Sequence, residues 1–214
     1  MHTDMLCNHI NRRMALSAAA FALATPLSAL ALPQDASPAT RQLVRWATET
    51  GDHQAMSFAV IDKPAARIHV FSAHGQWLSS APVLLGAALG DRSAPDIGQR
   101  PLSQIRPQER TTPAGRFVTE PGRNLRGEDI VWIDYETAVS LHRVRSVHAT
   151  ERRLQRLASP GVRDKRISYG CVNAPEAFYN QFIAPLFGHT HGVAYVLPDT
   201  ESFATIFVAA SAYP

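Results

Sequence analysis

The sequence predicts a mainly β domain with a few peripheral helices. From residue 55 onward the chain is built largely of short apolar or alternating runs, the pattern typical of strands. A turn at His74 and Gly75 joins two of these runs, as in a meander. No internal repeat, low-complexity tract or nucleotide-binding glycine loop interrupts them, which disfavours a βαβ architecture. The expected strands lie at 55–62, 66–73, 77–86, 129–134, 137–144 and 192–198.

The first 31 residues predict a secretory signal peptide. Arg12 and Arg13 precede an almost wholly apolar run at 14–24, and the residues at 29–31 supply a small-x-small cleavage pattern. The run is too short and too broken to be a good membrane span. The alternative is a buried N-terminal helix. We therefore expect export to the periplasm or cell envelope, with no stable membrane span after cleavage.

Two further segments complete the predicted organisation. Residues 32–54 begin as a polar linker and continue as a short helix that ends at Gly51, and residues 55–214 form one domain. Within this domain we expect a long surface loop at 88–110, a short helix at 149–159 and an amphipathic helix at 175–187. Leu154 and Leu157 should share one face of the short helix, and Phe178, Phe182 and Ile183 should face inward. The apolar tail at 203–210 is expected to pair with the sheet.

Charge excludes a general nucleic-acid binder but marks one segment. Without residues 1–31 the chain keeps 19 basic and 17 acidic residues, a net charge of +2. The basic residues nevertheless concentrate in 142–166, which carries eight Arg and Lys against two acidic residues. Such a run is usually a solvated face. The functional alternative is attraction of an anionic substrate or polymer.

The cysteine usage points to a free thiol. Removal of Cys7 with the signal leaves Cys171 without an intramolecular disulfide partner. Asn173 can act as the N-cap of the helix that follows, and helix-terminal amides would lower the pKa of the thiol and bind an oxyanion. Gly170 would allow close approach of a substrate. The alternative is that Cys171 is a small buried apolar residue.

A thiol nucleophile needs a base, and the chain has nine histidines. His142 and His148 lie nearest to Cys171 in the sequence, and His142 ends an apolar strand. The residues alone favour His142 only modestly, so His148 stays as the alternative.

Several motifs, taken in order, resemble the YkuD-type L,D-transpeptidases. The segment SYGCVN at 168–173 resembles their cysteine motif, written Ser/Thr-His-Gly-Cys, then a hydrophobic residue, then Asn or Arg. The segment FAVIDKPAARIHVFSAHGQW at 58–77 resembles their opening hairpin, and TTPAGRF at 111–117 their Thr-Pro-x-Gly-x-Phe segment. The strand SLHRV at 140–144 aligns with the one that carries the family's upstream histidine. The resemblance covers roughly residues 55 to 200.

The resemblance implies a YkuD-like β-sandwich or barrel-like fold and a set of roles. Cys171 would be the nucleophile and His142 the general base and acid, with Ser168 beside the site. The amides of Gly170 and Cys171 would donate to the oxyanion. Tyr169 replaces the family's histidine, and its hydroxyl can donate a hydrogen bond but does not titrate near neutral pH. The insertion before the motif explains the long separation of His142 and Cys171. No cofactor and no metal is implied.

The resemblance also implies a substrate, the stem peptide of peptidoglycan. Arg143, Arg145 and Asn173 would bind it, and the two arginines would clamp its carboxylates together with the other guanidinium groups of the insertion. The acyl acceptor would be an amine of another stem or of an envelope protein. Two alternatives stay open: a thiol L,D-carboxypeptidase or amidase that trims stems, and an inactive scaffold that binds peptidoglycan.

Overall fold

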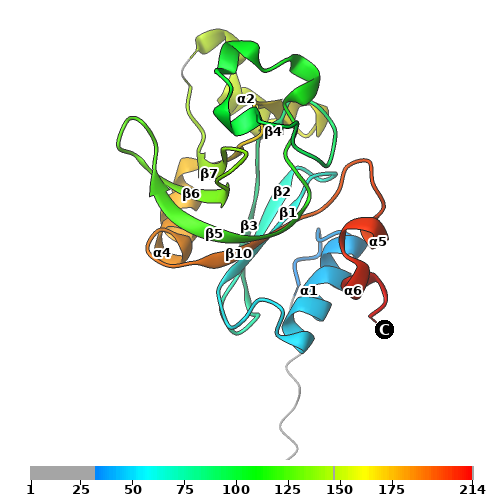
Figure 1. The fold of residues 1–214 in the computed structure, drawn as a ribbon. Coiled ribbons are helices and arrows are strands. Elements are labelled where there is room, and N and C mark those ends of the chain that lie inside the picture. Colours follow the sequence, from blue (N-terminus) through cyan, green and yellow to red (C-terminus); the bar gives the residue numbers. More distant parts are fainter. Residues whose placement is uncertain (1–31, 147, 214) are drawn as a thin grey trace, which may run out of the picture.

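A computed structural model describes residues 32–146 and 148–213 (Figure 1). The predicted signal peptide at 1–31 lies outside the described residues. The expected mainly β architecture is confirmed. Eight strands form one sheet in the order β3-β2-β1-β10-β5-β6-β7-β9, and β4 and β8 form a second, two-stranded sheet. The strands are β1 (Phe58–Asp62), β2 (Arg67–Phe71), β3 (Trp77–Pro82), β4 (Leu85–Gly86), β5 (Gly115–Arg123), β6 (Asp129–Asp134), β7 (Val139–Arg143), β8 (Arg166–Ser168), β9 (Val172–Ala174) and β10 (Gly192–Val196).

The large sheet curves until its two edges meet. Two antiparallel meanders, β1-β2-β3 and β5-β6-β7, are joined by β10, which runs parallel to β1 and antiparallel to β5. At one edge β9 pairs in parallel with β7. On its other side Asn173 exchanges two backbone hydrogen bonds of 2.9 Å with Leu84, which lies two residues after the end of β3. The sheet is therefore nearly closed, like a barrel.

In the middle of this sheet, at β1 and β10, both faces are buried. Along β1, Ala59 and Ile61 contact the interior core, whereas Phe58 and Val60 contact a second core on the outer face. This alternation follows from the two-residue period of a strand. Phe58 stacks on Phe71 at a centroid distance of 4.7 Å. A strand covered on both sides is continuously apolar, which is the pattern that the sequence shows here.

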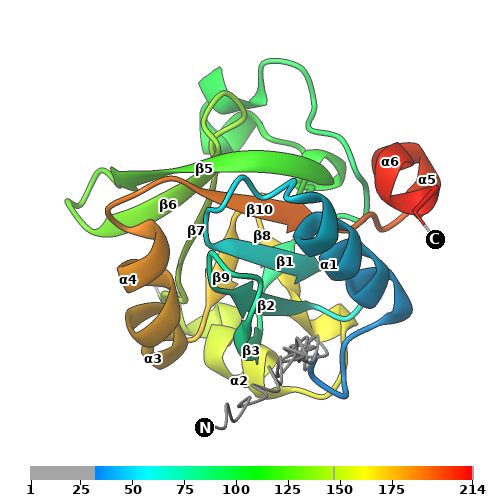
Figure 2. The same cartoon turned by 90° about the horizontal axis from the view of Figure 1, so that it is seen from below.

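Helices cover the outer core (Figure 2). Helix α1 (Pro38–Thr50) begins at Ser37, whose side chain accepts from the Thr40 amide, and ends at Gly51 in the left-handed conformation. The expected helix end is thus confirmed. The tail was expected to pair with the sheet, and this is wrong: it forms the short helices α5 (Phe203–Ile206) and α6 (Val208–Ser211). Their apolar residues pack with those of α1 in the outer core.

The remaining helices lie near the ends of β7 and β9. A continuous helix consists of α3 (Glu176–Phe178), a π-helical turn (Tyr179–Ile183) and α4 (Ala184–Phe187), with Phe178 and Ile183 buried and Phe182 half-buried. The basic segment is an insertion between β7 and β8, as expected, and carries α2 (Arg153–Ala158). Of its two leucines only Leu157 is buried, and Leu154 is exposed. The insertion therefore docks through one leucine, not through an apolar face.

The long loop 88–110 is tied to the sheet by buried charges. Its three 3-10 turns are Ile97–Gln99, Leu102–Gln104 and Pro107–Glu109. Beside it Lys63, which is wholly buried, donates to Asp91 at 2.8 Å and to two backbone carbonyls. Arg166 makes two hydrogen bonds, of 2.6 and 3.0 Å, to Asp199. We call Lys63, Asp91, Arg166 and Asp199 the buried ion cluster.

Candidate active site

Cys171 lies on the tight connection between β8 and β9. Gly170 has a φ of 140°, and a Cβ at this position would lie 2.8 Å from the carbonyl oxygen of Thr111. Only glycine fits there without strain. The Gly170 carbonyl accepts a hydrogen bond of 2.8 Å from the Thr112 hydroxyl. The TTPAGRF segment thus holds the connection that presents the thiol.

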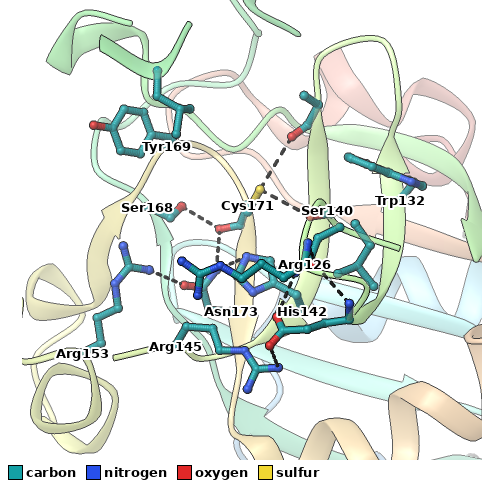
Figure 3. A pocket seen from close by; sticks show the side chains of 15 residues that line it. Arg126, Trp132, Ser140, His142, Arg145, Arg153, Ser168, Tyr169, Cys171 and Asn173 are labelled. Atoms are coloured by element: carbon teal, nitrogen blue, oxygen red, sulfur yellow. Dashed lines mark hydrogen bonds and ion pairs between the residues drawn. The ribbon is translucent and has the colours of Figure 1, made fainter. Parts of the chain in front are cut away.

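The register of β7 and β9 brings the polar side chains together (Figure 3). His142 pairs directly with Asn173 across the parallel ladder. Because side chains alternate, Ser140 shares a face with His142, and Cys171 shares a face with Asn173. The residues between them, Leu141 and Val172, point into the interior core.

The predicted N-cap role of Asn173 is wrong. Asn173 lies within β9, and the helix begins three residues later at Glu176. The helix terminus is therefore displaced along the chain from the thiol. Asn173 is wholly buried, and its side chain contacts His142 instead.

The thiol is surrounded by polar groups of β7. The sulfur lies 3.5 Å from the Ser140 hydroxyl and donates to the Ala138 carbonyl at 3.7 Å. Burial raises the pKa of the Cys171 thiol, but a hydrogen bond with His142, the charge of His142 and a hydrogen bond with Ser140 outweigh it. The pKa therefore lies below its ordinary value. This is the environment of a thiol that can act as a nucleophile.

Hydrogen bonds fix both nitrogens of the His142 ring. Nδ1 lies 2.7 Å from the Arg143 carbonyl oxygen, which can only accept, so Nδ1 carries the proton. Nε2 lies 3.1 Å from the Asn173 amide nitrogen. Nε2 is thus the nitrogen whose lone pair can act as a base.

Ser168 organises the backbone of the motif. Its hydroxyl donates to the Cys171 carbonyl at 2.6 Å and accepts from the Gly170 amide at 3.1 Å. The Gly170 amide, a predicted oxyanion donor, is therefore already bonded to Ser168.

A cavity of about 370 Å³ opens beside the thiol. Trp132 and Ile130 of β6 form part of its wall, and Leu102 lines it from the long loop. Three arginines also line it, namely Arg126, Arg145 and Arg153, which we call the pocket arginines. Arg145 pairs with Glu128 at 3.0 Å, and Arg153 pairs with Glu151 at 2.6 Å. The described lining carries more basic than acidic side chains, so the cavity favours an anionic ligand.

Arg143, predicted to bind substrate, does not line the cavity. It follows His142 in β7 and so points to the opposite face of the strand. There its guanidinium pairs with Asp129 at 2.8 Å and lies over the Tyr179 ring at 4.3 Å. His148, the alternative base, is exposed and also lies outside the cavity lining.

Tyr169 lines the cavity through its ring. The Arg110 guanidinium lies 4.1 Å from the ring centroid, the geometry of a cation–π contact. The hydroxyl points away from Cys171 (Figure 3). Tyr169 therefore links the motif to the long loop through its ring, and its hydroxyl does not face the thiol.

The residues Ser140 and Arg126 were missed from the sequence, and Arg153 was included only among the guanidinium groups of the insertion. Ser140 had a signal, since it lies two residues before His142 and must share its face in a strand. Arg126 sits in the β5–β6 turn and Arg153 at the start of α2, far from the motif in sequence. Only the folded arrangement brings them to the thiol.

Two absences hold for the described part of the chain. Over residues 32–146 and 148–213, no group of three or more His, Cys, Asp or Glu side chains could hold a metal ion. Within the same residues, no helix combines the length and apolarity needed to cross a lipid bilayer.

Comparison with known proteins gives distant structural similarity. No family model matches the sequence, and no curated protein matches it significantly. Among solved structures, an L,D-transpeptidase from Mycobacterium smegmatis is 16% identical, with 65% of this chain and 58% of that chain covered and a TM-score of 0.34. L,D-transpeptidase 1 from Mycobacterium tuberculosis is 18% identical, with coverages of 66% and 61% and a TM-score of 0.31. A variant of the helical cell shape determining protein Pgp2 from Campylobacter jejuni is 10% identical, with coverages of 82% and 62% and a TM-score of 0.42. In each case the match spans less than two thirds of the other chain.

Proposed function

We propose that this chain is a thiol-dependent acyl transferase of the L,D-transpeptidase type that acts on peptidoglycan stem peptides. The observation that carries the proposal is the pairing of His142 with Asn173 beside Cys171, at a cavity lined by arginines. The ordered motifs that resemble the YkuD-type enzymes support the same activity. Their cysteine, upstream histidine and asparagine correspond to these three residues.

The reaction proceeds in two steps. His142 accepts the thiol proton at Nε2, and the Cys171 sulfur attacks a peptide carbonyl carbon. As the C–N bond breaks, His142 returns the proton to the nitrogen of the leaving amino acid, and a thioester remains on Cys171. An acceptor amine then attacks the thioester carbon and gives a proton to His142. The C–S bond breaks, an amide forms, and the proton returns to the sulfur.

The Cys171 amide, the Ser140 hydroxyl and the pocket arginines assist these steps. The Cys171 amide is the proposed donor to the oxyanion, because the Gly170 amide is occupied by Ser168. Ser140 donates to the thiolate as it forms. The pocket arginines bind carboxylates of the stem peptide and orient it. Such a substrate requires the exported location that the N-terminal segment predicts, in the periplasm or cell envelope.

The same site supports a second enzymatic outcome. If water replaces the acceptor amine, the thioester is hydrolysed and the protein is an L,D-carboxypeptidase or amidase. An inactive scaffold is disfavoured, because a purely structural cysteine does not need partners that lower the pKa of its thiol.

Acylation by a carbapenem, followed by mass spectrometry of the intact protein, tests the proposal. We expect the mass of one acyl adduct on the wild type and none on Cys171→Ala. Incubation with purified muropeptides then separates the outcomes: cross-linked dimers indicate a transferase, and shortened stems indicate a hydrolase. If neither an adduct nor a changed muropeptide appears, the scaffold interpretation replaces the enzyme.

A further inference from the structure

The insertion between β7 and β8 reaches the catalytic base through a chain of hydrogen bonds. The guanidinium of Arg153 donates to the Asn173 side-chain oxygen at 2.7 Å. The Asn173 side-chain nitrogen lies 3.1 Å from His142 Nε2, and His142 Nδ1 lies 2.7 Å from the Arg143 carbonyl oxygen. Figure 3 shows these side chains side by side beneath Cys171.

The direction of every bond in this chain is determined. A guanidinium has only donors, so the Asn173 atom that faces Arg153 must be the oxygen. The amide nitrogen then faces His142, and an amide nitrogen only donates, so Nε2 accepts with its lone pair. The ring is therefore a neutral imidazole with its proton on Nδ1. One cation sets the orientation of the asparagine and the form of the histidine.

The surroundings keep this arrangement in place. The Arg153 side chain is only 13% exposed, and Glu151 holds it at 2.6 Å. A second bond, at 3.4 Å, runs from the Asn173 amide nitrogen to the Cys171 carbonyl. The backbone of Asn173 is fixed on both sides by Leu84 and β7. The side-chain amide can change only by rotating its oxygen and nitrogen ends.

The arrangement opposes proton transfer from the thiol. An imidazolium would point Nε2–H at the Asn173 amide N–H groups, and two donors facing each other cost free energy. Rotation of the amide would turn its oxygen toward Nε2–H, but its nitrogen would then face the donors of Arg153. The thiol correspondingly donates to the Ala138 carbonyl. While Arg153 binds Asn173, an imidazolium thus faces a donor instead of an acceptor at Nε2, and the ion pair forms less readily than it would after release of Asn173. This holds even though His142 and Ser140 keep the pKa of the Cys171 thiol below its ordinary value.

We propose that Arg153 is a positioning residue that holds the site at rest until a substrate carboxylate takes over its guanidinium. Arg153 lines the cavity, so a bound carboxylate can compete for it. Released from Arg153, the Asn173 amide rotates and its oxygen accepts from the His142 imidazolium, which stabilises the thiolate. The inference rests on the proposed roles of Cys171 and His142 as nucleophile and base.

Alkylation of Cys171 by the neutral reagent iodoacetamide tests this inference without any peptidoglycan. We expect Arg153→Leu to react about tenfold faster than the wild type, the equivalent of one hydrogen bond to a charged group. Electrostatics alone predict the opposite, because removing a nearby cation disfavours the thiolate. Arg152→Leu is the matched control: it removes the neighbouring cation, which is exposed and lies outside the cavity lining, and it should react no faster than the wild type. An unchanged or slower Arg153→Leu overturns the proposal.

Three further measurements complete the test. Glu151→Gln loosens the Arg153 side chain and should accelerate alkylation about 2- to 3-fold, which keeps the proposal falsifiable if Arg153→Leu does not fold. Nitrogen chemical shifts of His142 should show a proton on Nδ1 alone in the wild type and a second form in Arg153→Leu. The ratio of the iodoacetate rate to the iodoacetamide rate should fall in Arg153→Leu, since the carboxylate of iodoacetate docks on Arg153 in the wild type; an unchanged ratio contradicts the carboxylate step. These results stand whether or not the protein transfers acyl groups to amines.

Discussion

The buried ion cluster and the pocket arginines both concentrate charge, but they do so in opposite ways. In the buried ion cluster two cations meet two carboxylates, all at least nearly buried, and backbone groups complete the hydrogen bonds. The pocket arginines instead surround a cavity, and their described lining includes one acidic side chain, Glu128. A balanced cluster without space for a ligand stabilises the fold, whereas an unbalanced one around a cavity is suited to bind an anion.

The largest expected effect lies at the site itself. His142→Ala should slow acylation by a carbapenem about 10²- to 10⁴-fold, because the thiol loses its general base. The free energy of unfolding should change little, since His142 is only half-buried. His148→Ala is the control and should acylate at the wild-type rate. If His142→Ala acylates at the wild-type rate, another residue is the general base.

The second prediction concerns a substitution that disrupts the buried ion cluster. Lys63→Met should lower the free energy of unfolding by about 3–5 kcal/mol, because it leaves the buried carboxylates of Asp91 and Asp199 without their shared cation. Urea denaturation measures the loss. Arg92→Met, which removes the partner of Glu201 at an exposed pair, should be hard to separate from the wild type. Equal losses in the two variants would contradict the contrast between buried and exposed charge.

A third site tests a buried polar group outside both charge clusters. His69 in β2 is wholly buried, and neither ring nitrogen has a hydrogen-bond partner among residues 32–146 and 148–213. Burial lowers the pKa of His69. Below about pH 6.5 the unfolded chain binds a proton at His69 that the folded chain does not. The free energy of unfolding therefore decreases as the pH is lowered, by up to about 1.4 kcal/mol per pH unit.

Replacement of His69 should remove this dependence. His69→Phe is expected to flatten the pH profile of the free energy of unfolding between about pH 6.5 and 5, whereas the exposed His74→Gln should leave it unchanged. Denaturant titrations at several pH values measure the profile. A slope that persists in His69→Phe assigns the acid sensitivity to other groups.

The smallest effect compares two neighbouring arginines. Arg145→Leu should raise the carbapenem concentration for half-maximal acylation about 2- to 10-fold, since one partly exposed carboxylate contact is lost. Arg143→Leu should leave that concentration unchanged, because Arg143 faces Tyr179 and Asp129. Saturation curves for both variants provide the measurement. Equal effects would mean that strand alternation does not separate their roles.

Strand alternation also explains what the sequence could predict. Continuous or alternating apolar runs covered seven of the ten described strands but not β5, β8 or β9. The Gly51 signal located the end of α1. Both kinds of signal depend on local physics. The tail at 203–210 is apolar enough for a strand, but it forms helices because α1 offers an apolar surface there. Periodicity alone does not separate these two outcomes.

The candidate site was predictable only in part for the same reason. The motif identified Cys171 and the strand identified His142. Asparagine is a residue type that is common at N-caps. Asn173 nevertheless lies in β9, because it pairs with β7 and Leu84, and no local pattern encodes this pairing. Arg153 depends on how the insertion docks through Leu157, which is a tertiary property.

The bridge between Leu84 and Asn173 has a consequence for folding. These residues are far apart in the chain, so their pairing carries a large loop-closure entropy and should form late. The pairing of β9 with β7 already places Asn173 beside His142, and the bridge to Leu84 fixes the backbone of Asn173 from its other side. The fully fixed geometry around Cys171 is therefore expected only in molecules in which this edge of the sheet has closed.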